Sequence, residues 1–246
     1  MQKEGFFHPS DVFPYQPISR TWMLMYIISS FGFFIQLNRW VKSNEMKRHW
    51  LRENILLSFI HALICSILIL VGIVRAPEIF QDPLSHSNHF NYALIAFSIG
   101  YFCYDFLDCL RNSTTSVLAI LAHHVIVIAF LTHVLYHTRN VGYAIYGLSI
   151  EINSVFLHAR RLIRWYSPLT NFKSMKIFVE IGNYLTFIFI RFGIVIIGLR
   201  ALYFQRTRLH PLVHFLTVFS GLSIGMINVI LFYRLITNQF RRKSKE

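Results

Sequence analysis

Charged residues are scarce in this chain of 246 residues. Asp, Glu, Lys and Arg make up 14% of it, whereas a soluble domain contains about a quarter. Hydrophobic residues make up 54%, the mean hydropathy is +0.47, and the apolar residues stand in long blocks rather than at the spacing of an amphipathic helix. These features exclude an ordinary soluble domain and predict a polytopic helical membrane protein.

Cysteine and acidic residues are also scarce. The three cysteines, Cys65, Cys103 and Cys109, lie in apolar blocks. Neither a disulfide framework nor a zinc-binding spacing follows from them, so we expect packing residues and no metal site. The 11 acidic residues face 24 Lys and Arg, which gives a formal net charge of +13. Because the basic residues lie mainly between the apolar blocks, the positive-inside rule explains them and no nucleic-acid partner is expected.

The predicted fold is all-α, a transmembrane helical bundle of about seven spans. Each apolar block reaches or nearly reaches the ~20 residues that cross a hydrocarbon core of ~30 Å. The first block follows no basic start and precedes no small-residue cleavage site, so we expect an uncleaved anchor rather than a secretory signal. The blocks are Thr21–Leu37, Ile55–Val74, Asn91–Leu110, Val117–Tyr136, Gly142–Ala159, Ile177–Leu199 and Leu212–Ile236.

The loop charges predict the orientation. Fifteen Lys and Arg lie on the side of the bundle that carries the C-terminus, and seven lie on the opposite side. The richer side is expected to be cytoplasmic, which places the C-terminus inside. Short connections after the third and fourth blocks predict that the third, fourth and fifth spans form an antiparallel trio in direct contact.

Polar side chains interrupt five of the blocks. A central Asp, Lys or Arg costs about 2.5–3.5 kcal/mol of insertion free energy, so these groups must face the bundle interior. At a rise of 1.5 Å per residue, members from five helices lie about 6–12 Å from the predicted cytoplasmic end. We therefore expect a central cavity in the cytoplasmic half, lined by His61, Asp105, Asp108, His123, His124, Glu151, Asn153, Ser154, Glu180, Asn183 and Arg191.

Simpler interpretations remain open for some of these residues. His61 and His133 suit hydrogen-bond staples between helices equally well. Asp108 and His158 lie near span ends, where water at the interface would solvate them. The pair His123–His124, together with Glu151 at matching depth on the next span, favours a functional site more strongly.

Two runs carry a resemblance to a known family. LAHHVIVIAFLTHVLY and GYAIYGLSIEINSVFLHARRL resemble the TLC domain, which includes translocon-associated proteins, ceramide synthases and small lipid-homeostasis proteins. The runs WLRENILLSFIHALICS, SIGYFCYDFLDCL and IFIRFG are similar to the small branch implicated in plasma-membrane fluidity and phospholipid acyl composition. The resemblance implies an N-terminal segment with a first helix and basic loop (1–46), a six-span TLC domain around a central cavity (47–240) and a basic cytoplasmic tail (241–246).

The chain departs from the ceramide-synthase pattern. In that pattern the His pair is followed by a His-Asp and, three residues later, by another Asp. The matching positions here are Ile150, Glu151 and Ser154, so one carboxylate survives while the second His and second Asp do not. The chain also has no room for the homeobox-like insertion of many ceramide synthases. Both departures count against ceramide synthesis.

Three functions are compatible with these features. The favoured one, implied by the resemblance, is a regulator of membrane phospholipid acyl composition and fluidity that limits highly unsaturated chains. The second is an acyltransferase that uses acyl-CoA, in which His123 or His124 acts as base or acyl acceptor and is oriented by Asp105 or Glu151. The third is a translocon-type scaffold that binds partner proteins.

The partners and location follow from the same resemblance. Membrane lipids and fatty acyl chains are the expected partners; no cofactor is expected, with acyl-CoA a substrate if the protein is an enzyme. The small branch favours the plasma membrane, and the ceramide-synthase relatives favour the endoplasmic reticulum. Nothing in the sequence indicates the oligomeric state.

Overall fold

The computed structural model describes residues 19–44, 50–84, 87–112, 118–166 and 173–243, and within these ranges the secondary structure is entirely helical. The predicted segment before residue 19 and the tail from residue 244 lie outside the described residues. In chain order the elements are α1 (Arg20–Asn44), α2 (Trp50–Arg75), η1 (Pro77–Phe80), α3 (His89–Asn112), α4 (Leu118–His137), α5 (Val141–Ser149), α6 (Glu151–Trp165), α8 (Lys173–Thr186), the π-helix η3 (Phe187–Phe192), α9 (Gly193–Phe204), η4 (Arg206–Arg208) and α10 (Pro211–Lys243).

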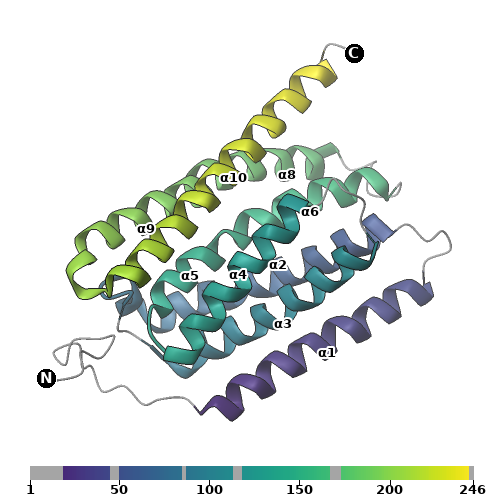
Figure 1. Ribbon diagram of the computed structural model, residues 1–246. Coiled ribbons are helices and arrows are strands. Elements are labelled where there is room, and N and C mark those ends of the chain that lie inside the picture. Colours follow the sequence, from purple (N-terminus) through teal and green to yellow (C-terminus); the bar gives the residue numbers. More distant parts are fainter. Residues whose placement is uncertain (1–18, 45–49, 85–86, 113–117, 167–172, 244–246) are drawn as a thin grey trace, which may run out of the picture.

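The predicted helical membrane bundle is confirmed. Figure 1 shows α1 on one side, α2 to α6 in the middle, and α8, α9 and α10 on the far side. Five helical stretches among the described residues are long and apolar enough to cross a membrane, namely Trp50–Arg75, His89–Asn112, Ile120–His137, Lys173–Phe204 and Pro211–Thr237. They correspond to the second, third, fourth, sixth and seventh predicted spans.

The other two predicted spans are helical but differ from simple apolar spans. α1 has 25 residues, and its polar residues lower its mean hydropathy. The fifth span is divided at Ile150 into α5, with nine residues, and α6, with 15. α6 carries Glu151, His158 and three arginines among its 15 residues, so neither half meets the length and composition of a span alone.

The fraction of buried residues is highest in the central helices and falls towards the outer ones, as expected for a bundle surrounded by lipid. In its apolar window α3 has 67% of its residues buried, whereas α10 has 6%. The outer helices expose large apolar side chains: Phe189 is 70% exposed and Tyr233 68%. Large apolar surface of this kind is stable against lipid tails rather than against water. The trio α3, α4 and α5 is in mutual contact, as predicted.

One end of the bundle is tied together by polar contacts. Arg208, between α9 and α10, donates to both carboxylate oxygens of Asp82, each at 3.3 Å, in the connection before α3. The hydroxyl of Tyr143 on α5 donates to Gln205 Oε1 at 3.1 Å. Two connections and α5 are therefore linked at this end, which the loop charges predict to be the non-cytoplasmic one.

α1 packs against α3 through a close backbone approach at Gly100. A Cβ atom there would lie 2.6 Å from the carbonyl oxygen of Ile27 and 2.6 Å from Ser30 Cβ. Ser30 Oγ also donates to the carbonyl oxygen of Phe97 at 2.6 Å. The absence of a side chain at Gly100 is what allows the two helices to meet here.

Replacement of Gly100 by Val should loosen the contact between α1 and α3. Because the added atoms would collide with backbone, we expect destabilisation of about 1–3 kcal/mol, measured as a lower melting temperature of the purified protein in detergent. The matched control is Gly32→Ala on α1, where a Cβ would meet nothing within 4 Å. Equal melting temperatures for Gly100→Val and the wild type would refute this packing.

Candidate functional site

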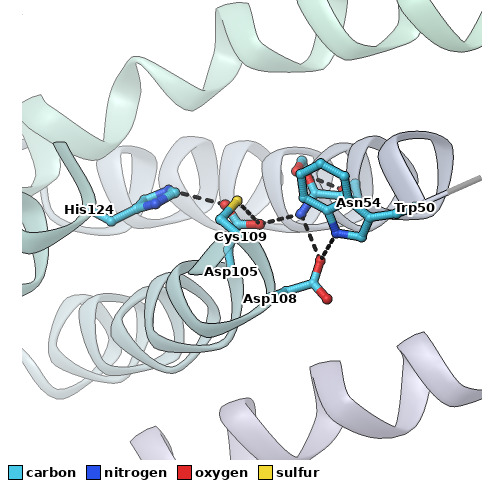
Figure 2. Close-up of polar contacts among 7 residues, drawn as sticks. Trp50, Asn54, Asp105, Asp108, Cys109 and His124 are labelled. Carbon is cyan, nitrogen blue, oxygen red and sulfur yellow. Dashed lines mark hydrogen bonds and ion pairs between the residues drawn. The ribbon is translucent and has the colours of Figure 1, made fainter. Parts of the chain in front are cut away.

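A hydrogen-bonded group joins α2, α3 and α4 around Asp105 (Figure 2). Asn54 Nδ2 on α2 donates to Asp105 Oδ1 at 2.6 Å. On the other side, His124 Nε2 on α4 lies 3.1 Å from Asp105 Oδ2. Asp105 and His124 are only 6% and 5% exposed, so this pair is held inside the bundle and is ordered by a donor from a third helix.

Asp108 lies one turn further along α3 and is also hydrogen-bonded from neighbouring residues. Trp50 Nε1 donates to Asp108 Oδ2 at 2.8 Å and Asn54 Nδ2 donates to the same oxygen at 3.2 Å. Asn112 Nδ2 donates to Asp108 Oδ1 at 3.1 Å. Asp108 is buried, so protein donors, not interfacial water, satisfy its carboxylate.

The two histidines of the α4 pair differ in their surroundings. His124 points toward Asp105 (Figure 2) and is buried, while His123 is half-buried beside it. Nδ1 of both rings is buried and has no hydrogen-bond partner among the described residues. The Asp105 carboxylate therefore orients the His124 ring through Nε2 and leaves Nδ1 without a partner.

A second polar group joins α6, η3 and α10 around Arg191. This guanidinium lies near the middle of the apolar stretch Lys173–Phe204 and is 7% exposed. Its Nε donates to Asn153 Oδ1 at 2.5 Å, Nη1 to Asn228 Oδ1 at 2.9 Å and Nη2 to Ser154 Oγ at 3.0 Å. Arg191 belongs to a six-residue π-helical segment, a local widening that is often found at functional sites.

Glu151 stands between the two groups. Glu151 begins α6, and its carboxylate interacts electrostatically with Arg191, His124 and Asp105. Ser154, three residues further along α6, accepts from Arg191 Nη2. A Cβ on Gly147, one turn before Glu151, would meet nothing within 4 Å, and the Glu151 side chain is itself only half-buried. The backbone at Gly147 therefore has free space beside it.

Of the remaining predicted site residues, Asn183 is buried with the polar group around Arg191 and Glu180 is not. Asn183 is fully buried, and its Oδ1 accepts from Asn153 Nδ2 at 3.1 Å. Glu180 turns away from Arg191 and lies 3.8 Å from Arg160 on α6, with 37% of its side chain exposed. The prediction that Glu180 and Arg191 need partners on other helices is confirmed. Glu180 does not join the buried groups, because it pairs with Arg160 and stays partly exposed.

His61 and His133, for which hydrogen bonds between helices were one interpretation, make contacts with other rings. His61 is completely buried, and both its ring nitrogens lack hydrogen-bond partners within the described ranges. Its ring stacks on Tyr101 with centroids 3.8 Å apart and an interplanar angle of 9°. The His133 ring lies 4.6 Å from that of His137 and is tilted by 52° to it. Nδ1 of His158 is buried and has no hydrogen-bond partner among the described residues.

Besides Asn112, three residues that contribute hydrogen bonds to these groups were not predicted from the sequence. Asn54 lies one residue before the second predicted span, and Trp50 belongs to a basic and aromatic loop that is typical of an interfacial anchor. Asn228 carried a usable signal, since it is an isolated amide inside the long apolar stretch Leu212–Ile236. In the described part of the chain, no three His, Cys, Asp or Glu side chains are arranged to hold a metal ion.

Comparison with known proteins places this arrangement in a family. The TLC domain matches residues 52–237, which is most of the chain. The chain belongs to the TLC domain family. It is 33% identical over 226 residues to TLC domain-containing protein 2 of Danio rerio, across 89% of this chain and 90% of that protein. It is also 29% identical over 118 residues to TLC domain-containing protein 1 of Rattus norvegicus, which is 48% of each chain.

These relatives confirm the resemblance to the small TLC-domain branch. Human TLC domain-containing protein 2 is 26% identical over 194 residues, 77% of this chain and 71% of that protein. All the buried polar residues described above except Trp50 lie inside the part that matches the TLC domain. The candidate site is therefore a feature of the TLC domain of this membrane protein.

Replacement of Asn54 by Leu should destabilise the bundle. The change removes the amide donor from two buried carboxylates, and a buried acceptor without its donor costs about 1–3 kcal/mol. We expect a clearly lower melting temperature in detergent. Gln36→Leu, an exposed amide on α1, controls for the gain of apolar surface. A melting temperature for Asn54→Leu equal to that of Gln36→Leu would contradict the assigned contacts.

Proposed function

We propose that this protein regulates membrane lipids by binding a lipid inside the TLC domain. The acyl chain would lie among the apolar helices, and the polar head would lie at the level of Asp105, His124, Glu151 and Arg191. The observation that carries the proposal is the buried layer itself. Polar groups from α2, α3, α4, α6, η3 and α10 are buried in the membrane interior, although burial of each charge is costly.

The direction of lipid entry follows from the asymmetry of the bundle. The end that carries Asp82 and Arg208 is held together by polar contacts between two connections and α5. The opposite end carries most of the basic loop residues and is expected to be cytoplasmic. Lipid would therefore enter from the cytoplasmic leaflet, where anionic lipids are also attracted to basic loops.

The finer role is inferred from the family resemblance. The protein would bias which acyl chains enter phospholipids, limit the incorporation of highly unsaturated ones and so restrain membrane fluidity. The favoured location is the plasma membrane, with the endoplasmic reticulum as the alternative. The C-terminus would lie in the cytoplasm.

Deletion of the gene should raise the polyunsaturated fraction of phospholipids in cells fed polyunsaturated fatty acids, as measured by lipidomics, and should loosen packing in a fluidity-sensitive dye assay. Re-expression of the wild type should restore both values. Arg191→Met, which removes the buried charge, should restore neither at equal protein abundance. Phe189→Leu on the lipid-facing surface should restore both. Unchanged phospholipid unsaturation after deletion would overturn the proposal.

One observation favours a catalytic alternative. His124 is oriented by Asp105 at 3.1 Å and keeps an unpartnered Nδ1, which is the arrangement of a general base or acyl acceptor. Acyl transfer from acyl-CoA to an amine or a lysophospholipid would use this nitrogen. The basic loops would attract the phosphates of coenzyme A.

Purified protein incubated with radiolabelled oleoyl-CoA and a lysophospholipid separates the two functions. Acyl transfer at His124 predicts labelled product, a loss of at least 100-fold in rate for His124→Ala, and a wild-type rate for Phe189→Leu. Absence of labelled product, together with full cellular activity of the His123→Ala/His124→Ala double variant, would exclude the enzyme and leave the binding function.

A further inference from the structure

The partners of Arg191 are all electrically neutral. Its three hydrogen bonds go to two amide oxygens and one hydroxyl, on Asn153, Asn228 and Ser154. Among the described residues no carboxylate forms an ion pair with it, although Glu151 attracts it electrostatically. A positive charge is thus held in the membrane interior without a direct counter-ion, an arrangement that is normally costly.

The surrounding group has more donors than acceptors. The oxygens that accept are occupied: Asn153 Oδ1, Asn228 Oδ1 and Ser154 Oγ by Arg191, and Asn183 Oδ1 by Asn153. The amide nitrogens of Asn183 and Asn228 are buried and have no acceptor in the described ranges. A guanidinium has five N–H groups, so two remain after the three bonds. The local surplus is one of positive charge and N–H donors.

The three neutral partners, Asn153, Ser154 and Asn228, also hold the guanidinium in place. Nε, Nη1 and Nη2 are each fixed by a partner, from α6 on one side and α10 on the other. On the same stripe of the α5–α6 span as Ser154, a Cβ on Gly147 would meet nothing within 4 Å, and Glu151 is half-buried. Donors that are fixed before a ligand arrives lose little entropy on binding, and a planar guanidinium suits an oxyanion with two oxygens.

We propose that Arg191 is the receptor for the oxyanion of a lipid head, either a carboxylate or a phosphate ester, and that Asn153, Ser154 and Asn228 position it. This inference rests on the proposed lipid-binding function and adds the chemistry of the head. The lipid supplies a direct counter-ion, which the described residues do not provide. The acyl chain runs from this point into the apolar part of the bundle.

Binding to the full-length protein in detergent tests the inference with matched probes. Oleate and oleyl alcohol share a chain and differ in the anionic head, as do 1-oleoyl lysophosphatidate and monoolein. We expect each anionic lipid to bind at least tenfold more tightly than its neutral match. In Arg191→Met this preference should disappear while the neutral lipids keep their affinity; Arg191→Lys should retain part of it. Arg208→Met, at the opposite end, should retain all of it.

A second variant covers the case in which Arg191→Met does not fold. Asn228→Asp keeps the oxygen that accepts from Nη1 and adds a negative charge beside the guanidinium. This internal counter-ion should raise or preserve the melting temperature and weaken oleate binding at least tenfold, with oleyl alcohol unaffected. If Arg191 only clamps α6 to α10, oleate binding by Asn228→Asp will match the wild type, and the inference is overturned.

The remaining outcomes separate this inference from the proposed function. Equal affinities for oleate and oleyl alcohol, and for lysophosphatidate and monoolein, would overturn the role of Arg191 and leave lipid binding intact. Binding of inorganic phosphate with no binding of the four lipids would overturn both. A preference for oleate alone assigns the site to carboxylates, and a preference for lysophosphatidate alone assigns it to phosphate esters; either result supports the inference.

Discussion

The rest of this structure depends on the hydrogen bonds and ion pairs that buried charged side chains form with neighbouring helices. A carboxylate or guanidinium in the membrane interior finds no water, so its partners must come from neighbouring helices. Asp105 takes its partners from α2 and α4, and Arg191 takes its partners from α6 and α10. Each charge therefore fixes the relative position of three helical segments at once, which apolar packing between similar aliphatic surfaces specifies much less strongly.

Glu151 interacts electrostatically with both charged groups. The group on α2, α3 and α4 has carboxylates and an imidazole, whereas the group on α6, η3 and α10 has a guanidinium framed by neutral amides. Their chemistry is complementary. The layer combines an imidazole paired with a carboxylate and a guanidinium fixed by amides. A lipid with a polar head and an apolar chain suits such an environment better than a water-soluble ligand does.

Much of this was predictable from particular residues. Long apolar blocks gave the helical membrane bundle, and Asp105, His124, Glu151 and Arg191 stood out because ionisable groups are rare in such blocks. Their partners were harder to predict. Asn54 lay outside the predicted span, Trp50 matched the pattern of an interfacial anchor, and Asn228 is a single amide whose contact with Arg191 depends on the packing of α10. Hydrogen-bond partners on different helices require the tertiary arrangement.

The direction of individual side chains was also hidden. Glu180, Asn183 and Arg191 fall on one stripe at ordinary helical spacing, but the π-helix at Phe187–Phe192 changes that spacing before Arg191, and Glu180 turns to Arg160. The division of the fifth span at Ile150 left no clear mark in the pattern of apolar residues. Local departures from regular helix geometry are selected by packing, which hydropathy does not report.

The most direct test of the central claim is an electron cryomicroscopy map of the protein in lipid nanodiscs. The account predicts an elongated non-protein density inside the bundle, with its broad polar end beside Arg191 and Glu151 and its tail among the apolar side chains of the core. Side chains packed continuously through this region, with His123 and His124 turned toward the surrounding lipid and no density next to Glu151, would contradict it.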